Sequence, residues 1–266
     1  MNGSRLFIPL SMVLCFLFLW CGCGGVDPGM MLRDCVEACE SYASGNNYLK
    51  FREEVLLELE SGGQRLNQTI IVEGESIFPL SQSYWRQESW IDPEGSDTVA
   101  ATDYRYLTLD GGKSVYVRGK KIESALGTSA WVYYVPPPGD NRYFDFTRTM
   151  RLITAEPFGL SAQEEEGGLR IRFNADLEEI LRVRLEEVGQ EWREEFSRFL
   201  DEGMGRELSV EVVLDRASVL PREIRAEVEA RKEDVRAYTR LTWQFSGFWE
   251  EPPGAIEPPA FYIKAG

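Results

Sequence analysis

The hydrophobic positions of this 266-residue chain change their spacing several times, and each change predicts a different element. An almost unbroken apolar run follows Arg5 and extends from Leu6 to Trp20. From Met30 to Tyr42 the apolar residues recur at helical spacing, with Leu32, Cys35, Val36 and Cys39 on one stripe. Ser44-Gly45-Asn46-Asn47 is a typical end for this predicted helix.

Beyond this helix the apolar period becomes two, as in half-buried β-strands. The predicted strands of the first half cover residues 49–60, 64–78, 84–91, 104–109, 113–118 and 131–135. Ser61-Gly62-Gly63 and Asp110-Gly111-Gly112 supply turns between them. Glu53 is an exception within an otherwise apolar row. The first half therefore predicts an antiparallel meander.

The second half mixes helical and alternating patterns. Residues 140–155 favour a helix that Asp140 would cap, although Phe144 and Phe146 alternate as in a strand. Phe158–Ala162 and Leu169–Phe173 predict a hairpin. Period-two alternation returns in 208–214, 221–231 and 235–248, before a Pro-rich tail from Glu250. In all, the pattern predicts roughly ten antiparallel strands and three helices in one domain.

Asp176–Leu200 has the strongest helical pattern in the chain. Its apolar stripe comprises Leu177, Leu181, Leu185, Val188, Trp192, Phe196 and Phe199, and most of the other positions are Glu or Arg. Such a stripe is typical of core packing. The alternative is a lid over a hydrophobic cavity, with Trp192 and Phe196 facing a ligand.

The N-terminal apolar run is shorter than a membrane-spanning helix, which needs about 20 residues, and suits a signal-peptide core of roughly 7 to 15. Its end, Gly22-Cys23, resembles the lipobox of bacterial lipoproteins. That resemblance implies removal of residues 1–22, a lipid on Cys23 and a Gly/Pro tether over residues 23–29. Trp20 departs from the usual Leu. Cys21 as the lipidated residue, a plain secretory signal and an uncleaved anchor helix remain alternatives.

Composition narrows the function further. The formal net charge is −15, which disfavours nucleic-acid binding. With no histidine, the chain lacks the usual general base and the commonest zinc ligand. No catalytic constellation, metal site or cofactor motif is present in the sequence, so we expect a protein that is not an enzyme. A glycosidase remains a remote alternative, because 44 acidic residues contain no distinctive pair.

Cys35 and Cys39 stand one helical turn apart. Two small buried thiols are the favoured interpretation. A disulfide within one helix would be strained but is sterically accessible, and a metal site is disfavoured.

The order of elements resembles the LolA/LolB-like superfamily, and most of all the lipoproteins grouped with LppX and LprG. The residues that carry the resemblance are Ser41-Tyr42, Val72-Glu73-Gly74, Phe78-Pro79, Val115-Tyr116-Val117, Trp131, Leu220-Pro221, Phe245-Ser246 and Ile256-Glu257-Pro258. They span the mature chain, and their order carries more weight than any single motif. The long segment at 176–200 departs from the lipid carriers of this superfamily.

The resemblance implies a mainly β (α+β) domain over residues 30–266. A single, strongly curved antiparallel sheet would form an unclosed half-barrel, with helices capping its concave face. Members bind acyl chains of lipoproteins or glycolipids, and related domains act as envelope sensors. We therefore expect a membrane-anchored lipoprotein of the cell envelope that binds a lipid. A sensor or assembly factor with a protein partner is the alternative. The cavity candidates are Trp90, Trp131, Trp192, Phe196 and Trp243.

Overall fold

The computed structural model describes residues 26–78, 82–93, 99–127, 130–136, 146–176, 207–232, 234–248 and 254–265. The helical elements are α2 (Pro28–Ser44), the 3-10 turn η1 (Asp110–Gly112), α3 (Lys120–Leu126) and α4 (Phe146–Ile153). The strands are β1 (Tyr48–Ser61), β2 (Gln64–Ile77), β3 (Gln82–Pro93), β4 (Val99–Leu109), β5 (Ser114–Gly119), β6 (Trp131–Tyr134), β7 (Phe158–Glu165), β8 (Gly168–Asp176), β9 (Glu207–Asp215), β10 (Pro221–Lys232), β11 (Val235–Ser246) and β12 (Tyr262–Lys264).

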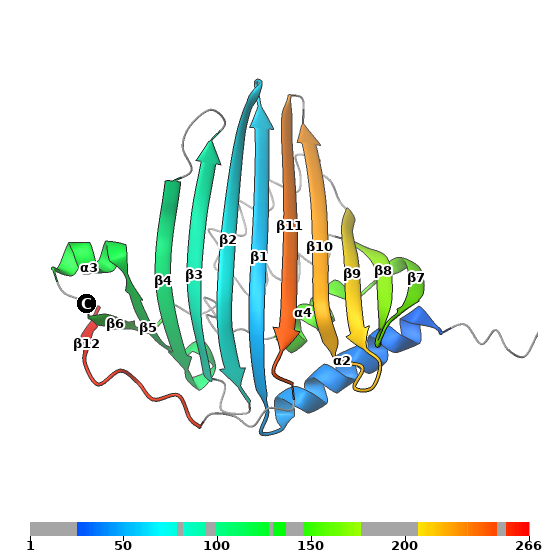
Figure 1. Cartoon of the computed structure of the whole chain (residues 1–266), viewed down its shortest axis with the longest axis horizontal. Coiled ribbons are helices and arrows are strands. Elements are labelled where there is room, and N and C mark those ends of the chain that lie inside the picture. The colour runs from blue at the N-terminus through cyan, green and yellow to red at the C-terminus, as the bar shows by residue number, and fades with distance from the viewer. Residues whose placement is uncertain are drawn as a thin grey trace, which may run out of the picture.

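Within these described residues the strands form a single 12-stranded sheet (Figure 1). Its order is β12-β6-β5-β4-β3-β2-β1-β11-β10-β9-β8-β7, so β1 and β11 meet at the centre and the two ends do not pair. All pairs are antiparallel except β12 with β6, which is parallel. The expectation of one unclosed, mainly antiparallel sheet is confirmed. The finer expectation, that helices cap a concave face, stays a prediction.

The strand register separates an apolar from a polar face. Across β8, β9, β10 and β11, the residues Ile171, Val212, Ile224 and Trp243 lie side by side on the apolar face. Glu53 continues this row on β1, between Trp243 and Val72. The intervening positions carry mostly Arg, Glu and other polar residues on the opposite face. We call these the apolar face and the polar face of the sheet.

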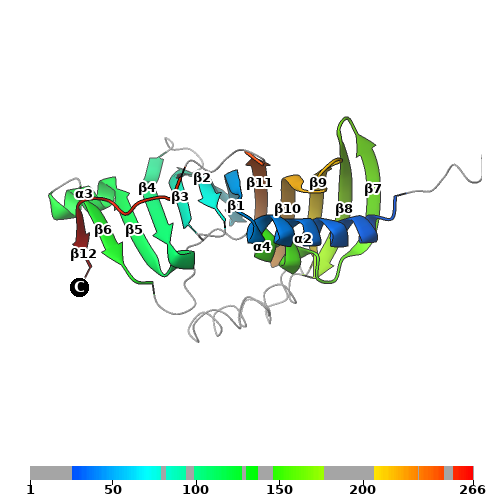
Figure 2. The ribbon, with the colours of Figure 1, turned by 90° about the horizontal axis from the view of Figure 1, so that it is seen from below.

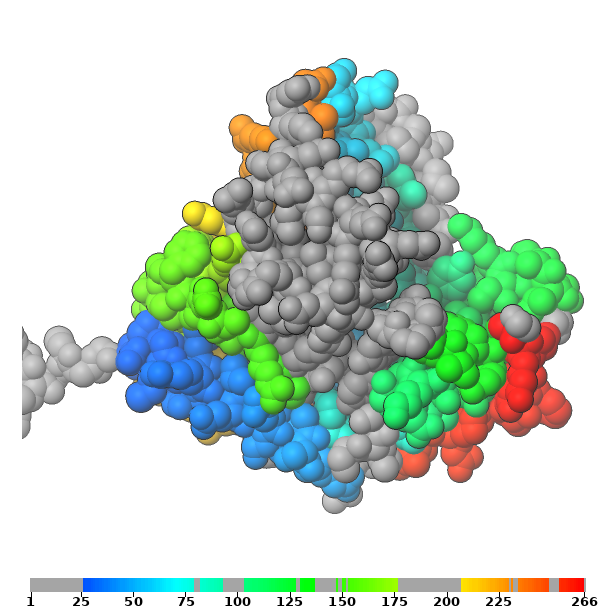
Figure 3. All heavy atoms as spheres, turned by 180° about the vertical axis from the view of Figure 1, so that it is seen from behind, coloured from blue at the N-terminus to red at the C-terminus, as the bar shows by residue number. Residues whose placement is uncertain are grey.

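Helices α2 and α4 pack against the apolar face at the β7–β11 side of the sheet. Both belong to one core cluster, in which Leu32, Cys35 and Met150 are buried with strand residues such as Phe173 and Val210. The two helices contact each other, and α2 also contacts β7. Figures 2 and 3 show α2 and α4 side by side near the ends of these strands. This half of the sheet therefore holds the main core of the described residues.

The predicted helix over Met30–Tyr42 is confirmed as α2, which extends two residues further at each end. Asp27 is the N-cap, and its side chain accepts hydrogen bonds from the backbone N–H groups of Gly29 and Met30 at 2.9 and 3.3 Å. Cys35 and Cys39 are free, fully buried thiols on the inner face of α2. This is the favoured interpretation of the pair.

Other predicted boundaries change. The helix expected within residues 140–155 is α4, which ends at Ile153. Asp176 is the last residue of β8 rather than the start of a helix, and residues 177–200 lie outside the described residues. The sequence pattern missed α3 and also β12, which lies in the Pro-rich tail.

Candidate functional site

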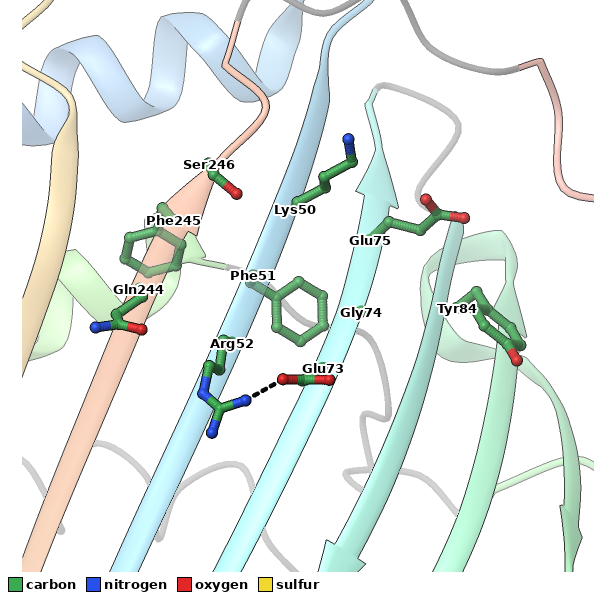
Figure 4. Close-up of a pocket in the computed structure, with 10 residues that line it drawn as sticks. All are labelled: Lys50, Phe51, Arg52, Glu73, Gly74, Glu75, Tyr84, Gln244, Phe245 and Ser246. Atoms are coloured by element: carbon green, nitrogen blue, oxygen red, sulfur yellow. Dashed lines mark hydrogen bonds and ion pairs between the residues drawn. The ribbon is translucent and has the colours of Figure 1, made fainter.

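An opening of about 640 Å³, lined by described residues, lies at the centre of the sheet (Figure 4). It is lined by residues of β1, β2, β3 and β11, namely Lys50, Phe51, Arg52, Glu73, Gly74, Glu75, Tyr84, Gln244, Phe245 and Ser246. By register, seven of these residues belong to the polar face, and Phe51, Gly74 and Phe245 occupy the positions between them. We call this the polar opening.

Two cross-strand rows of side chains form its walls. One row runs Ser246, Lys50, Glu75 and Tyr84, and the other runs Gln244, Arg52 and Glu73. Arg52 forms an ion pair with Glu73 (Figure 4). The Tyr48 hydroxyl donates to Glu75 at 2.5 Å, and the Lys50 ammonium lies 5.5 Å from the Tyr48 ring centre.

The two carboxylates of the polar opening are each held by a neighbouring side chain. Here Glu73 pairs with arginine and Glu75 accepts a hydrogen bond from tyrosine. Both groups therefore act as hydrogen-bond acceptors that position their neighbours.

A second surface of interest lies on the apolar face, toward the end of the sheet away from α2 (Figure 1). Aliphatic side chains of β1 and β2 form it, namely Val55, Leu57, Leu59, Leu66 and Ile70. Val55 is paired with Ile70, and Leu59 with Leu66. None of the five belongs to the core cluster, and Leu59 and Leu66 remain 43% and 40% exposed. We call this set the aliphatic strip.

The sheet places the predicted cavity residues on different faces. Trp243 of β11 lies on the apolar face, where it is half-buried and packs against the core. Trp90 of β3 is paired with Thr69 and lies on the polar face. Trp131 begins β6 on the same face as Tyr133, whose partner is Tyr116. Cys23, Trp192 and Phe196 lie outside the described residues. The described tryptophans are therefore not brought together, and their binding role stays a prediction.

Sequence reasoning did not single out either surface as a site. For the aliphatic strip, the sequence shows only the alternation that predicts a strand. The exposure of its side chains depends on which parts of the apolar face the helices leave uncovered. The polar opening depends on cross-strand neighbours such as Lys50 and Glu75, which are far apart in sequence. No local motif marks it.

In the described part of the chain, no group of three or more His, Cys, Asp or Glu residues is placed to hold a metal ion. Among those same residues, no helix has the length and apolar character needed to cross a membrane.

Comparison with known proteins finds solved structures that resemble this chain, but it does not show a family to which the chain belongs. No family model matches the chain, and no curated protein matches it. A DUF1329 family protein from Desulfovibrio piger is similar over 86% of this chain and 96% of its own length, with a TM-score of 0.26 and 8% identity. A β-barrel-like protein of the domain of unknown function DUF1849, from Brucella abortus, covers 74% of this chain and 98% of itself, with a TM-score of 0.25 and 13% identity.

A weaker likeness is to MucB in complex with MucA(peri), with a TM-score of 0.13, 7% identity, and coverage of 83% of this chain and 94% of the other. At these identities and TM-scores, none of the three establishes a family or a function. The strand order and the core of this chain themselves define an open, mainly β sheet with α2 and α4 on its apolar face.

Proposed function

We propose that this chain is a non-enzymatic, membrane-anchored lipoprotein of the LolA-like kind, which works outside the cytoplasm and binds the acyl chain of a lipid on the aliphatic strip. The lipobox-like Gly22-Cys23 supports the anchor, through a lipid on Cys23. The observation that carries the binding role is the row of aliphatic side chains on the apolar face that stay partly exposed and outside the core.

The energetics of the strip are adequate for this role. Completing the burial of a half-exposed Val, Leu or Ile side chain gains about 1 kcal/mol. Five such residues contribute about 5 kcal/mol, and each buried methylene of the acyl chain adds about 0.8 kcal/mol of its own. Even after the cost of association, this is compatible with micromolar affinity, which requires about 8 kcal/mol.

The direct test is native mass spectrometry, followed by organic extraction, of mature protein purified from its own envelope. We expect a co-purifying lipid at near-equal stoichiometry. A protein that carries no co-purifying lipid and does not bind added lipids would contradict the proposal.

A matched pair of variants locates the site. Leu57 and Leu56 are adjacent, both half-buried, and point to opposite faces of β1. Leu57→Gln should lower the affinity for a fatty-acid probe by about fivefold, because it removes apolar contact worth about 1 kcal/mol. Leu56→Gln should leave the affinity unchanged. Equal effects of the two variants would place any lipid elsewhere. A lack of lipid binding by the parent protein and both variants would contradict the proposal.

A second candidate function is recognition of a protein partner, as a sensor or assembly factor. Edge strand β7 favours it, because most of its residues are exposed along Phe158–Glu165 and its outer backbone groups face no further strand among the described residues. A stable partner in pull-downs, protection of β7 amides on binding and an absence of lipid would favour this function over the first.

A further inference from the structure

A compact group of cations lies on the polar face of β3, β4 and β5, remote from the aliphatic strip. The register pairs Arg86 with Arg105, and Arg105 with Arg118. The three arginines therefore stand side by side on adjacent strands, and we call them the arginine row. Like charges placed directly opposite one another on a sheet repel and are destabilising. The row therefore needs nearby carboxylates to offset this repulsion, and the chain as a whole is acidic, with a net charge of −15.

Carboxylates compensate two of the three arginines. Arg86 donates to both oxygens of Asp103 at 3.2 and 3.3 Å and also pairs with Glu88. Arg118 donates to Glu123 of α3 at 2.7 Å. The hydrogen bond from Arg86 lowers the pKa of the Asp103 carboxyl, so Asp103 is fully ionised at neutral pH.

Arg105 and Lys120 are left with a surplus of positive charge. Within the described ranges, neither side chain takes part in a hydrogen bond or an ion pair, and both are exposed. They share Asp103 only through longer-range attraction. Beside them lie one further arginine, Arg118, and the carboxylates of Asp103 and Glu123.

These side chains surround a pocket of about 200 Å³, lined by Asp103, Arg105, Arg118, Gly119, Lys120 and Glu123. Gly119 lies beside this pocket and permits β5 to approach β4 closely. A Cβ there would clash with the Tyr104 ring and lie 2.7 Å from the backbone oxygen of Asp103. The close approach of β5 to β4 fixes Arg118 and Lys120 on either side of this residue, next to Arg105.

We propose that this pocket binds a phosphate-type oxyanion, held by Arg105 and Lys120 and bordered by Arg118. A guanidinium fork and an ammonium group match the oxygens of a phosphate in geometry and charge. The pocket has room for one such group. Its acidic lining residues are engaged, Asp103 by Arg86 and Glu123 by Arg118. The net negative charge elsewhere opposes binding only weakly, because physiological salt screens charges beyond about 8 Å.

Titration of the full mature protein with inorganic phosphate, followed through the arginine Nε–Hε signals by NMR, tests the proposal. We expect the Arg105 signal to shift and saturate at millimolar phosphate. Arg105→Gln should weaken binding, measured by calorimetry, by about tenfold, because it removes a charge-assisted contact. Arg225→Gln is the matched control, since Arg225 lies on the same face of β10 with only a long contact to Glu223 at 3.9 Å.

The source of the phosphate is resolved with vesicles. Binding of free phosphate with no preference for vesicles of phosphatidic acid over phosphatidylcholine indicates a soluble ligand. Binding that requires phosphatidic acid and is lost in Arg105→Gln indicates a lipid headgroup. The absence of binding in both arms, or an equal loss in Arg225→Gln, would overturn the proposal. Circular dichroism confirms that the variants stay folded, which is expected for two exposed side chains.

Discussion

At the scale of single residues, Gly74 shows how tightly the central strands pack. It lies on β2 opposite Phe51 and Trp85, on the apolar face. A Cβ at this position would lie 2.5 Å from the Trp85 Cβ and 2.9 Å from the Phe51 ring, and closer still to the Tyr84 carbonyl oxygen. The absent side chain thus lets two aromatic rings occupy the space behind the polar opening.

We expect Gly74→Ala to destabilise the protein by about 1–3 kcal/mol, the usual cost of overpacking in a core. Urea unfolding followed by tryptophan fluorescence measures the loss. Gly29→Ala is the control, because its new Cβ would come no nearer than 3.4 Å to Asp27 and should change stability little. An unchanged midpoint for Gly74→Ala would mean that the rings move aside.

At the scale of elements, the connection between β9 and β10 depends on one carboxylate. Asp215 Oδ1 accepts hydrogen bonds from the backbone N–H groups of Ala217 and Ser218 at 3.0 and 2.9 Å, and from the Ser218 hydroxyl at 2.9 Å. Arg222 pairs with the other oxygen of this carboxylate, Oδ2. These bonds hold a turn in which Val219 takes a φ of 61°, a costly value for a β-branched residue.

The hydrogen bond from the Ser218 backbone is the largest cause that lowers the pKa of Asp215, followed by the Ser218 hydroxyl and Arg222. A lowered folded-state pKa contributes stability above the unfolded value of about 3.9, and that contribution is lost as the pH falls through the folded-state pKa. Asp215→Ala should therefore cost about 1 kcal/mol at pH 7 and progressively less below pH ~4.

Denaturant unfolding of parent and variant across acidic pH measures this difference. Asp234→Ala, in the turn before β11, is the control and should differ little from the parent at any pH. A difference for Asp215→Ala that is independent of pH would show that the turn depends on shape rather than on charge.

Elements with a strong local period could be predicted, whereas their neighbours in the sheet could not. Alternation in residues 49–60 was enough to predict β1, including the unusual Glu53. It carried no information on pairing with β11, which sets the centre of the sheet and brings Lys50 beside Ser246. Strand β12 has three residues and no usable period, so only its contact with β6 defines it. The polar opening and the arginine row consist of such cross-strand contacts and were invisible for the same reason.

At the scale of the whole molecule, the two faces of the sheet have different roles. Polar residues, including many Arg–Glu pairs such as Arg52–Glu73 and Arg172–Glu211, cover one face and keep it solvated. The apolar face holds the core at one side and the aliphatic strip further along the strands. In the proposed function, a lipid on Cys23 would keep this strip near the membrane that supplies its ligand.

Cys23→Ser should shift the protein from the membrane fraction to the soluble fraction, because the serine hydroxyl cannot accept the thioether-linked lipid. Fractionation of cells that express each variant measures the shift. Cys21→Ser should stay with the membrane. Continued attachment of Cys23→Ser would indicate lipidation at Cys21 or an uncleaved anchor.

The pairing of β1 with β11 also constrains when the protein can fold. Phe51 of β1 is opposite Phe245 of β11. The ribosome therefore makes β1 early, but β1 can complete its hydrogen bonds with β11 only after most of the chain has been synthesised. Such long-range closure slows folding and leaves the edge of β1 open to wrong partners during synthesis. In the proposed function, export of the whole chain in an extended form would let β1 and β11 pair only after both strands have crossed the membrane.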